Sequence, residues 1–538
     1  MSFQQYVERI LSTTLIKVTN EVLYSPAQTR TGHQVLIPYP TALAPLSLRC
    51  GIGQLTRMTF DMLADDVLLE IFDFFVKEQG MHKWVRLAHV CRRWRNVVFQ
   101  SPHRLDLRLI CTDKTPARNA LDIWPPLPLI IIFGYFNYVN NTRLDNLIAA
   151  LEHNDRVCRI EFNSSWSRPL QAVTESAAMQ KPFPQLTDLR ICDAVERWEG
   201  PIRPVPNSFL GGSAPRLRSL YLENIAFPGL APNLLLSATH LVHLELYRIT
   251  SAGYIPLEAI ATSLTALNSL ESLRLHFRGP RPRPALESRR PPPPLQTRSI
   301  LPILTKIRFQ GVSEYLAGIL ARIDAPRLNE LDITFFNQII FDTPQLFQFI
   351  SRSPILSAPE KGHITFNYDA VSIRFPSQTP DYGKLGVRIP CTTSEWQLSS
   401  LEQVCTSSLP PFSTLEDLYI FEDQEFPPCW QDDIENTLWQ ELLQPFAVVK
   451  YLYLCENVMP RIAPALQELV GGRATEVLPN LEKIFLEEFL PTGPFRRLHE
   501  GIEKFVAARR LAGHPLTVSR WDKDWRWDVE WRRETSVR

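Results

Sequence analysis

The segment Leu217-Arg218-Ser219-Leu220-Tyr221-Leu222 is one copy of a phrase that recurs along most of the chain. Its form is Leu-x-x-Leu-x-Leu, with another large apolar residue allowed in place of leucine. Side chains alternate across a strand, so the last two apolar positions of each phrase point to the same side of an extended segment. Each copy therefore predicts a strand that is buried on one side. The nine copies are Leu186/Leu189/Ile191, Leu217/Leu220/Leu222, Leu241/Leu244/Leu246, Leu270/Leu273/Leu275, Leu304/Ile307/Phe309, Leu328/Leu331/Ile333, Leu415/Leu418/Ile420, Val449/Leu452/Leu454 and Leu481/Ile484/Leu486.

The distance between copies predicts a repeat architecture. Their first residues are 31, 24, 29, 34, 24, 87, 34 and 32 residues apart, close to the period of leucine-rich repeats. Helical patterns fill the intervals, so each unit consists of a strand and a helix. We expect an α/β solenoid, a horseshoe of parallel strands with outer helices. The helical patterns lie at 257–267, 313–323, 345–350, 398–405, 434–443 and 462–470.

The interval of 87 residues spans about three periods and holds strand-like segments at 364–368, 371–375 and 385–389. We expect one or two degenerate units of the same kind in it. The phrase is degraded between 336 and 415, so the exact repeat count stays open.

Residues that alternate with the inward leucines are expected to line the concave face of the horseshoe. Tyrosine and arginine, both common anchors of protein interfaces, recur among them. We therefore predict that this face binds a protein target, although a merely solvated strand face would show the same alternation. The predicted target-binding residues are Tyr221, His243, Glu245, Tyr247, Arg274, His276, Arg308, Asp332, Tyr419, Tyr453 and Phe485.

The composition is that of a folded protein with no general affinity for nucleic acid. Hydrophobic residues make up 45% of the 538 residues and charged residues 21%, which excludes disorder of the whole chain. The 57 lysines and arginines equal the 57 aspartates and glutamates, so the global basic field that attracts nucleic acid or acidic lipid is absent. The nine cysteines form no Cys-x-x-Cys pair and are interpreted as reduced thiols.

No targeting or membrane segment is recognisable in the sequence. Residues 1–16 lack the continuous apolar core of a secretory signal. The longest apolar run, at 127–133, is far shorter than the roughly 20 residues of a membrane helix and is predicted to be a buried strand. We expect a protein of the cytosol or nucleus without a membrane partner.

The region 63–101 shows helical spacing instead of the phrase. Apolar residues from Val67 to Phe75 form one stripe, with Asp65 and Asp66 in the first turn, where negative charge favours a helix. A second stripe runs from Trp84 to 98 and predicts one or two further helices. Pro102 is expected to stop the last one at the preceding residue.

The same region carries a specific order of residues. It reads Leu63-Ala-Asp-Asp-Val-Leu-Leu-Glu-Ile-Phe, then Trp84 and Leu87, then Val90-Cys-Arg-Arg-Trp-Arg, and then Ser101-Pro102. This order resembles the F-box over about 45 residues, with one departure, because F-boxes usually carry proline where Ala64 stands. The segments 89–109 and 505–518 are similar to the large F-box families of mushroom-forming fungi, in which a divergent leucine-rich array follows the F-box.

The resemblance implies a role in ubiquitin ligation. F-box proteins are substrate receptors that bind the Skp adaptor, and through it a cullin-RING ligase, while the downstream domain holds the protein target. A ligase-independent interaction scaffold is the alternative. Carried over to this chain, the adaptor-binding residues are Leu63, Leu68, Ile71, Phe72, Val90, Cys91 and Trp94, of which only some can face the adaptor.

These patterns divide the chain into five parts. We expect a poorly ordered leader at 1–57, with Met58 as a candidate translation start, an F-box at 58–105, and a connecting segment with the array's N-terminal cap at 106–175. The array follows at 176–520 and carries a Pro/Arg-rich loop at 278–297, read as a solvated insertion or as a polyproline ligand. The Trp-rich tail at 521–538 is expected to cap the last repeat.

No catalytic or cofactor motif is present. The chain has no phosphate-binding Gly-x-x-x-x-Gly-Lys loop, no Gly-x-Ser-x-Gly elbow, no His-Glu-x-x-His motif and no dinucleotide fingerprint. His240 and His243 lack the further ligands of a metal site of known spacing. We predict a protein that is not an enzyme and has no cofactor or metal, while a hydrolase with an unrecognised site stays a third hypothesis.

Overall fold

The computed structural model divides the chain into two compact units. The helical unit comprises residues up to Ile110 together with Trp124–Pro128, and the array unit comprises Cys111–Ile123 and Leu129–Arg538. The structure describes residues 63–79, 84–134, 141–164, 167–193, 205–226, 232–250, 253–279, 298–336, 341, 343–376, 383–430, 434–487 and 496–521. The predicted leader, most of the Pro/Arg-rich loop and the tail after Trp521 lie outside these residues, as does the question of Met58.

The described residues of the helical unit form three helices, each where the sequence predicts one: α2 (Asp65–Gln79), α3 (Trp84–Ala88) and α4 (Arg92–Gln100). The core of this unit is aromatic: the Phe72 and Trp94 rings lie 4.8 Å apart, and the Trp84 indole donates to the Arg108 carbonyl over 2.8 Å. α4 ends at Gln100 and has Ser101 as its C-cap, directly before Pro102, which agrees with the expected stop. One member of the predicted stripe, Val67, is 44% exposed and does not belong to the core.

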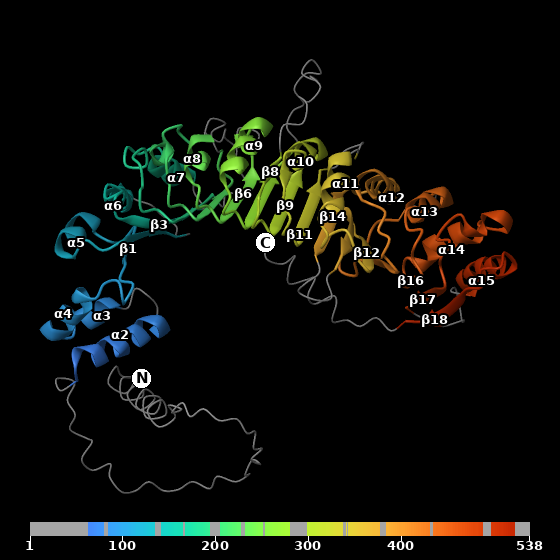
Figure 1. Ribbon diagram of the computed structural model, residues 1–538, viewed down its shortest axis with the longest axis horizontal. Coiled ribbons are helices and arrows are strands. Elements are labelled where there is room, and N and C mark those ends of the chain that lie inside the picture. Colours follow the sequence, from blue (N-terminus) through green and yellow to red (C-terminus); the bar gives the residue numbers. More distant parts are fainter. Residues whose placement is uncertain are drawn as a thin grey trace, which may run out of the picture. The chain divides into compact units, whose positions relative to one another are not determined.

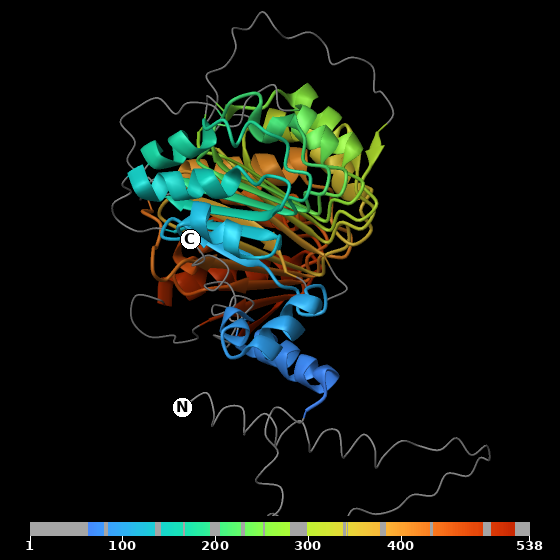
Figure 2. The same ribbon diagram turned by 90° about the vertical axis from the view of Figure 1, so that its left-hand side faces the viewer.

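The array unit is built on one long sheet, whose strands follow the order β1-β2-β3-β4-β5-β6-β7-β9-β11-β14-β13-β12-β15-β16-β17-β18. Figures 1 and 2 show these strands side by side in one layer. The strand bounds are β1 Leu109–Thr112, β2 Leu129–Phe133, β3 Val157–Ser164, β4 Asp188–Asp193, β5 Ser219–Glu223, β6 His243–Ile249, β7 Ser272–Phe277, β9 Lys306–Gly311, β11 Glu330–Phe335, β12 Lys361–Phe366, β13 Ala370–Phe375, β14 Lys384–Pro390, β15 Asp417–Glu422, β16 Tyr451–Leu454, β17 Lys483–Leu486 and β18 Thr517–Arg520, and a separate pair joins β8 Ser299–Ile300 to β10 Ile323–Asp324.

The nine phrases form the core of this sheet. None of their 27 apolar side chains is more than 3% exposed. Equivalent positions pair directly, so that Leu220 lies beside Leu244, which lies beside Leu273. This in-phase parallel register places every phrase on the same side of the sheet, and the expected one-sided burial is confirmed.

Helices cover the side of the sheet to which the phrases point (Figure 1). Each predicted helical interval between phrases contains a helix, because its apolar residues complete the core under the adjoining strands. The helices of this unit are α5 Ala117–Ile123, α6 Asn141–Leu151, α7 Ser167–Thr174, α8 Pro232–Ser237, α9 Leu257–Ala266, α10 Ser313–Leu320, α11 Pro344–Ser351, α12 Ser394–Gln403, α13 Asn436–Leu443, α14 Met459–Gln467 and α15 Arg496–Leu511.

The middle of the array differs from the prediction of one or two degenerate repeats. Its three strand-like segments form β12, β13 and β14, but β13 is antiparallel to both neighbours. β14 pairs in parallel with β11, and β12 pairs in parallel with β15, so the three strands enter the sheet in reverse order. An antiparallel insertion therefore bridges the two parallel halves of the array, because β12 and β14 point the same way as the rest.

The sheet also begins earlier than the predicted start at residue 176. β2 pairs in parallel with β3 and β3 with β4, in the same manner as the phrases. The segment predicted as a connection and cap therefore supplies strands of its own. The apolar run at 127–133 forms β2, as the prediction of a buried strand requires. Among the residues that the structure describes, no helix is both long and apolar enough to cross a membrane.

Candidate protein-binding face

The side of the sheet opposite the helices, here called the strand face, carries the residues that alternate with the buried phrases. All eleven predicted target-binding residues lie there, and each is half-buried or exposed, with none in the core. Tyr221, Glu245 and Arg274 occupy matching positions of β5, β6 and β7. The structure places these residues on the side of the sheet opposite the buried phrases, while target binding stays a prediction.

The C-terminal half of the strand face holds a row of adjacent rings, here called the aromatic ladder: His363, Tyr419, Tyr453 and Phe485. Their strands pair in register, so the four residues stand directly beside one another on β12, β15, β16 and β17. Successive ring centroids are 4.7, 4.1 and 4.5 Å apart. The first pair is tilted by 60°, and the planes of the last two pairs are nearly parallel, at 9° and 4°. The repeat thus builds a continuous aromatic surface.

Trp521 adds a fifth ring to this surface. Its backbone N–H donates to the Leu486 carbonyl over 2.8 Å, and its indole lies 5.7 Å from Tyr419 and 5.5 Å from Tyr453. The sequence predicts that this tryptophan caps the last repeat, but the residue instead packs on the strand face. The other predicted capping tryptophans lie outside the described residues.

Three of the four ladder residues are readable in the sequence, whereas the fourth, His363, and the added ring of Trp521 are not. Tyr419, Tyr453 and Phe485 occupy the same position of three successive phrases, which is a readable signal. His363 belongs to the inserted β12, whose neighbour β15 is 50 residues away in the chain, and Trp521 follows β18. Neither residue belongs to a copy of the phrase, so the sequence does not indicate on which side of the sheet it lies.

Charges border the aromatic ladder. Asp417 lies next to Lys361 at 3.9 Å and accepts a hydrogen bond from the Tyr453 hydroxyl. Burial raises the pKa of Asp417 although Lys361 opposes this effect. At the other end, the Lys483 ammonium stands 4.5 Å from the Phe485 ring centroid, in a cation–π contact.

A second group of side chains, here called the tyrosine–arginine cluster, lies on β4 to β7. The Arg190 guanidinium lies 4.4 Å from the Tyr221 ring centroid, and that of Arg274 lies 4.6 Å from the Tyr247 ring centroid. The His276 ring meets Tyr247 edge-on at 4.2 Å. Burial, with help from neighbouring arginines, lowers the pKa of His276 to about 4, so this imidazole is neutral at neutral pH.

Glu223 organises the polar part of this cluster. Its carboxylate accepts from the Tyr221 hydroxyl at 2.6 Å and from the Cys192 thiol at 2.9 Å. Arg248 lies 3.9 Å from the same carboxylate. Burial and the bond to Glu223 together raise the pKa of Tyr221, so its hydroxyl keeps the proton that it donates.

Between the two groups the strand face is charged. Arg308 and Lys306 on β9 both pair with Glu330 on β11, at 2.6 and 3.2 Å. Burial opposes ionisation of Glu330, but the hydrogen bonds from Arg308 and Lys306 outweigh it and lower the pKa of this carboxyl. Asp332 lies two residues further along β11, while the predicted residue His243 is exposed on β6 and belongs to neither group.

In the helical unit, the predicted adaptor-binding residues divide into two sets. Leu68, Ile71, Phe72 and Trp94 are at most 5% exposed and form its core. Leu63 is half-buried, and Val90 and Cys91 are exposed. Because the first set is buried, it holds the helices of the unit together but cannot contact a partner in this conformation. Val67 and Phe74 are seven residues apart on α2 and therefore lie on the same side of that helix. They are 44% and 38% exposed and are not among the predicted adaptor-binding residues.

The described residues contain no group of three or more His, Cys, Asp or Glu side chains placed to hold a metal ion. The His240/His243 pair thus gains no further ligand among them. The strand face offers aromatic surface, cationic side chains and hydrogen-bonding groups, which is the chemistry of protein recognition.

No protein-family model, of an enzyme or of any other kind, matches the chain, and no curated protein matches it. Among solved structures, it is similar to the leucine-rich repeat-containing protein LegL7 from Legionella pneumophila. The two are 10% identical over 74% of this chain and 97% of that chain, with a TM-score of 0.23. At this TM-score the likeness adds nothing to the fold described above.

Proposed function

We propose that this protein is a non-catalytic substrate receptor of a Skp-cullin-F-box ubiquitin ligase. In this proposal the helical unit binds the Skp adaptor, and the strand face of the array binds the protein to be ubiquitinated. The observation that carries the target-binding half is the aromatic ladder together with the tyrosine–arginine cluster, because Tyr, Trp and Arg are the residues in which binding energy at protein interfaces concentrates.

The adaptor-binding half rests on the F-box resemblance and on the exposed apolar residues of the helical unit. Val67, Phe74 and Val90 are 44%, 38% and 50% exposed, although apolar side chains of this size favour burial. A contiguous exposed apolar surface is typical of a site that a partner covers, and Val67 and Phe74 lie seven residues apart on α2, on the same side of that helix. These three residues, rather than the buried Leu68 or Ile71, are therefore the ones to change in a binding test.

The test is co-purification of the tagged full chain with the purified Skp adaptor. The wild type should retain the adaptor, and the double variant Val67→Asp with Val90→Asp should lose it, because each change places a charge on the proposed contact surface. Phe347→Asp is the matched control, since Phe347 is 37% exposed on α11 of the array. Circular dichroism of each variant checks the fold.

The outcome distinguishes the two hypotheses that the sequence leaves open. Retention by the wild type and by Phe347→Asp, with loss in the folded double variant, supports the receptor. If the folded wild type does not retain the adaptor, the receptor proposal fails and the ligase-independent scaffold replaces it.

A further inference from the structure

Three exposed aromatic side chains lie away from the strand face, in segments that follow the carboxyl ends of three strands; this end of the strands is here called the edge of the sheet. Tyr368, Trp396 and Phe426 are 51%, 53% and 55% exposed, and no other Phe, Tyr or Trp among the described residues is more than half exposed. They belong to the β12–β13 turn, the start of α12 after β14, and the loop after β15. Because β12, β14 and β15 point the same way, all three segments leave the same edge of the sheet.

These three residues, here called the edge patch, stand on a fixed frame. The Tyr368 N–H donates to the Phe426 carbonyl over 3.0 Å, and the two rings lie 5.7 Å apart. Asp423 holds the second loop, since its carboxylate accepts from the backbone N–H groups of Glu425 at 3.0 Å and Phe426 at 3.2 Å. The position of Phe426 is therefore determined by hydrogen bonds on both sides.

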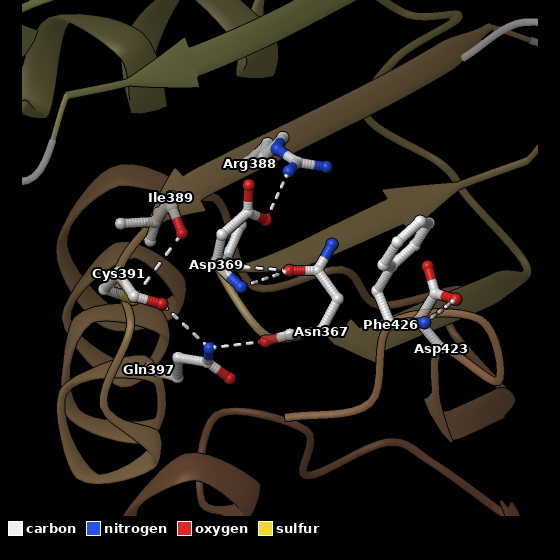
Figure 3. A network of polar contacts seen from close by, with 9 residues as sticks. Asn367, Asp369, Arg388, Ile389, Cys391, Gln397, Asp423 and Phe426 are labelled. Carbon is white, nitrogen blue, oxygen red and sulfur yellow. Dashed lines mark hydrogen bonds and ion pairs between the residues drawn. The ribbon is translucent and has the colours of Figure 1, made fainter. Parts of the chain in front are cut away.

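The buried side chain of Gln397 joins the third segment to the turn (Figure 3). Its amide donates to the Asn367 carbonyl over 2.8 Å and to the Cys391 carbonyl over 2.9 Å. Gln397 follows Trp396 directly on α12, and Asn367 precedes Tyr368. The Asn367 side chain in turn accepts from the N–H groups of Asp369 and Ala370, which fixes the turn itself.

Acidic residues accompany the edge patch. The segments 367–369, 391–396 and 423–430 contain Asp369, Glu395, Asp423 and Glu425 but no lysine or arginine. Two arginines from outside these segments contact them: Arg388 at the end of β14 pairs with Asp369 at 2.9 Å (Figure 3), and the Arg461 guanidinium lies 6.0 Å from the Trp430 ring centroid. Glu395 and Glu425 are exposed, so two of the three segments present a carboxylate at the surface beside the aromatic side chains.

We propose that the edge patch is a second protein-docking surface and that it binds a basic, arginine-containing peptide segment of a partner. Guanidinium groups stack on exposed Tyr, Trp and Phe rings and pair with carboxylates, so one type of side chain satisfies both features of the surface. A pre-ordered frame lowers the entropy lost on binding. The surface is separate from the strand face and does not depend on the ubiquitin-ligase proposal.

The test measures fluorescence polarisation of a labelled peptide titrated with the full chain. The probe is a twelve-residue repeat of glycine, arginine and serine, and its counterpart carries glutamate in place of arginine. The wild type should bind the arginine peptide at least tenfold more tightly than the glutamate peptide. Binding should weaken as the salt concentration rises from about 50 to about 200 mM, because the charges are partly exposed.

Two variants separate the aromatic and the ionic contributions. Tyr368→Ala with Phe426→Ala should weaken binding of the arginine peptide at least tenfold while keeping the backbone hydrogen bond between these residues. Glu395→Gln with Glu425→Gln should weaken it several-fold and flatten the salt dependence. Phe347→Ala, an exposed aromatic change on α11, is the control and should stay within twofold of the wild type.

Three results would overturn the proposal. The first is a wild type that does not bind the arginine peptide at millimolar protein. The second is an aromatic double variant that is folded by circular dichroism and binds the peptide like the wild type. The third comes from sedimentation velocity: if the aromatic variant converts a dimer of this chain to a monomer and leaves peptide affinity unchanged, the occupant is a second copy.

Discussion

The aromatic ladder makes a quantitative prediction about local stability. Tyr453 is its central residue, with ring contacts to Tyr419 at 4.1 Å, Phe485 at 4.5 Å and Trp521 at 5.5 Å. Aromatic pairs contribute about 0.5–1.5 kcal/mol each beyond the area that they bury. Tyr453→Ala removes all three ring contacts, so we expect the rings alone to account for a loss of about 3 kcal/mol in this part of the array, the sum of three pairs at about 1 kcal/mol each.

Backbone hydrogen exchange measures this loss locally. A loss of about 3 kcal/mol corresponds to roughly a hundredfold faster exchange of the amides that become exposed when this part of the array unfolds locally, because about 1.4 kcal/mol is a factor of ten. The affected amides should be those of β15, β16 and β17. Each unit of a repeat array contacts mainly its neighbours, so β4 to β7 should keep their protection.

Two variants serve as controls. Tyr453→Phe keeps the ring and loses the hydroxyl that donates to Asp417 and accepts from the Tyr419 hydroxyl. Exchange in β15 to β17 should therefore rise about thirtyfold at most, the value of two hydrogen bonds of about 1 kcal/mol each, and stay slower than in Tyr453→Ala. Tyr247→Ala should speed exchange in β5 to β7 and spare the C-terminal strands. If Tyr453→Ala changes protection of β15 to β17 less than about threefold, ring stacking does not stabilise this half of the sheet, and the reasoning is refuted.

Three further predictions concern pH, packing and thiol reactivity. Burial, with Lys361 and Arg374, lowers the pKa of His363 from 6.5 to about 4, so between these values the unfolded chain binds a proton that the folded chain does not. Stability should therefore fall as the pH falls from about 6.5 to about 4, and the urea midpoint of His363→Phe should depend less on pH in that range. At Gly318 an added Cβ would lie 2.2 Å from a Leu257 methyl group, so Gly318→Ala should cost about 1–3 kcal/mol and lower the melting temperature, with partial recovery in the double variant that also carries Leu257→Ala. Brief iodoacetamide labelling, read by mass spectrometry, should modify the exposed Cys91 and Cys429 before the buried cysteines of the described residues. The buried set is Cys111, Cys158, Cys192, Cys391, Cys405 and Cys455. Equal labelling of both sets would contradict the burial.

The sequence determined the repeating part of the fold because the alternation of apolar residues within each phrase is enough to define a strand and its buried side. Each phrase buries its own apolar residues on one side, and adjacent copies then pair in phase. Tyr419, Tyr453 and Phe485 could be assigned to the strand face for the same reason, since they occupy one position of successive phrases. The helices of the N-terminal region followed from spacing and from the stop at Pro102.

Only the tertiary structure decided the middle of the array and the surfaces that depend on it. An alternating strand has the same pattern whether its neighbour is parallel or antiparallel, so β13 could not be distinguished from a degenerate repeat. His363 joined the ladder, and Trp521 covered it, through pairings between segments distant in the chain. In the helical unit, Val67 and Leu68 are adjacent and both apolar, yet Val67 is exposed and Leu68 is buried. Spacing defines the apolar side of a helix, but which residues at its margin are covered depends on the neighbours that pack against it.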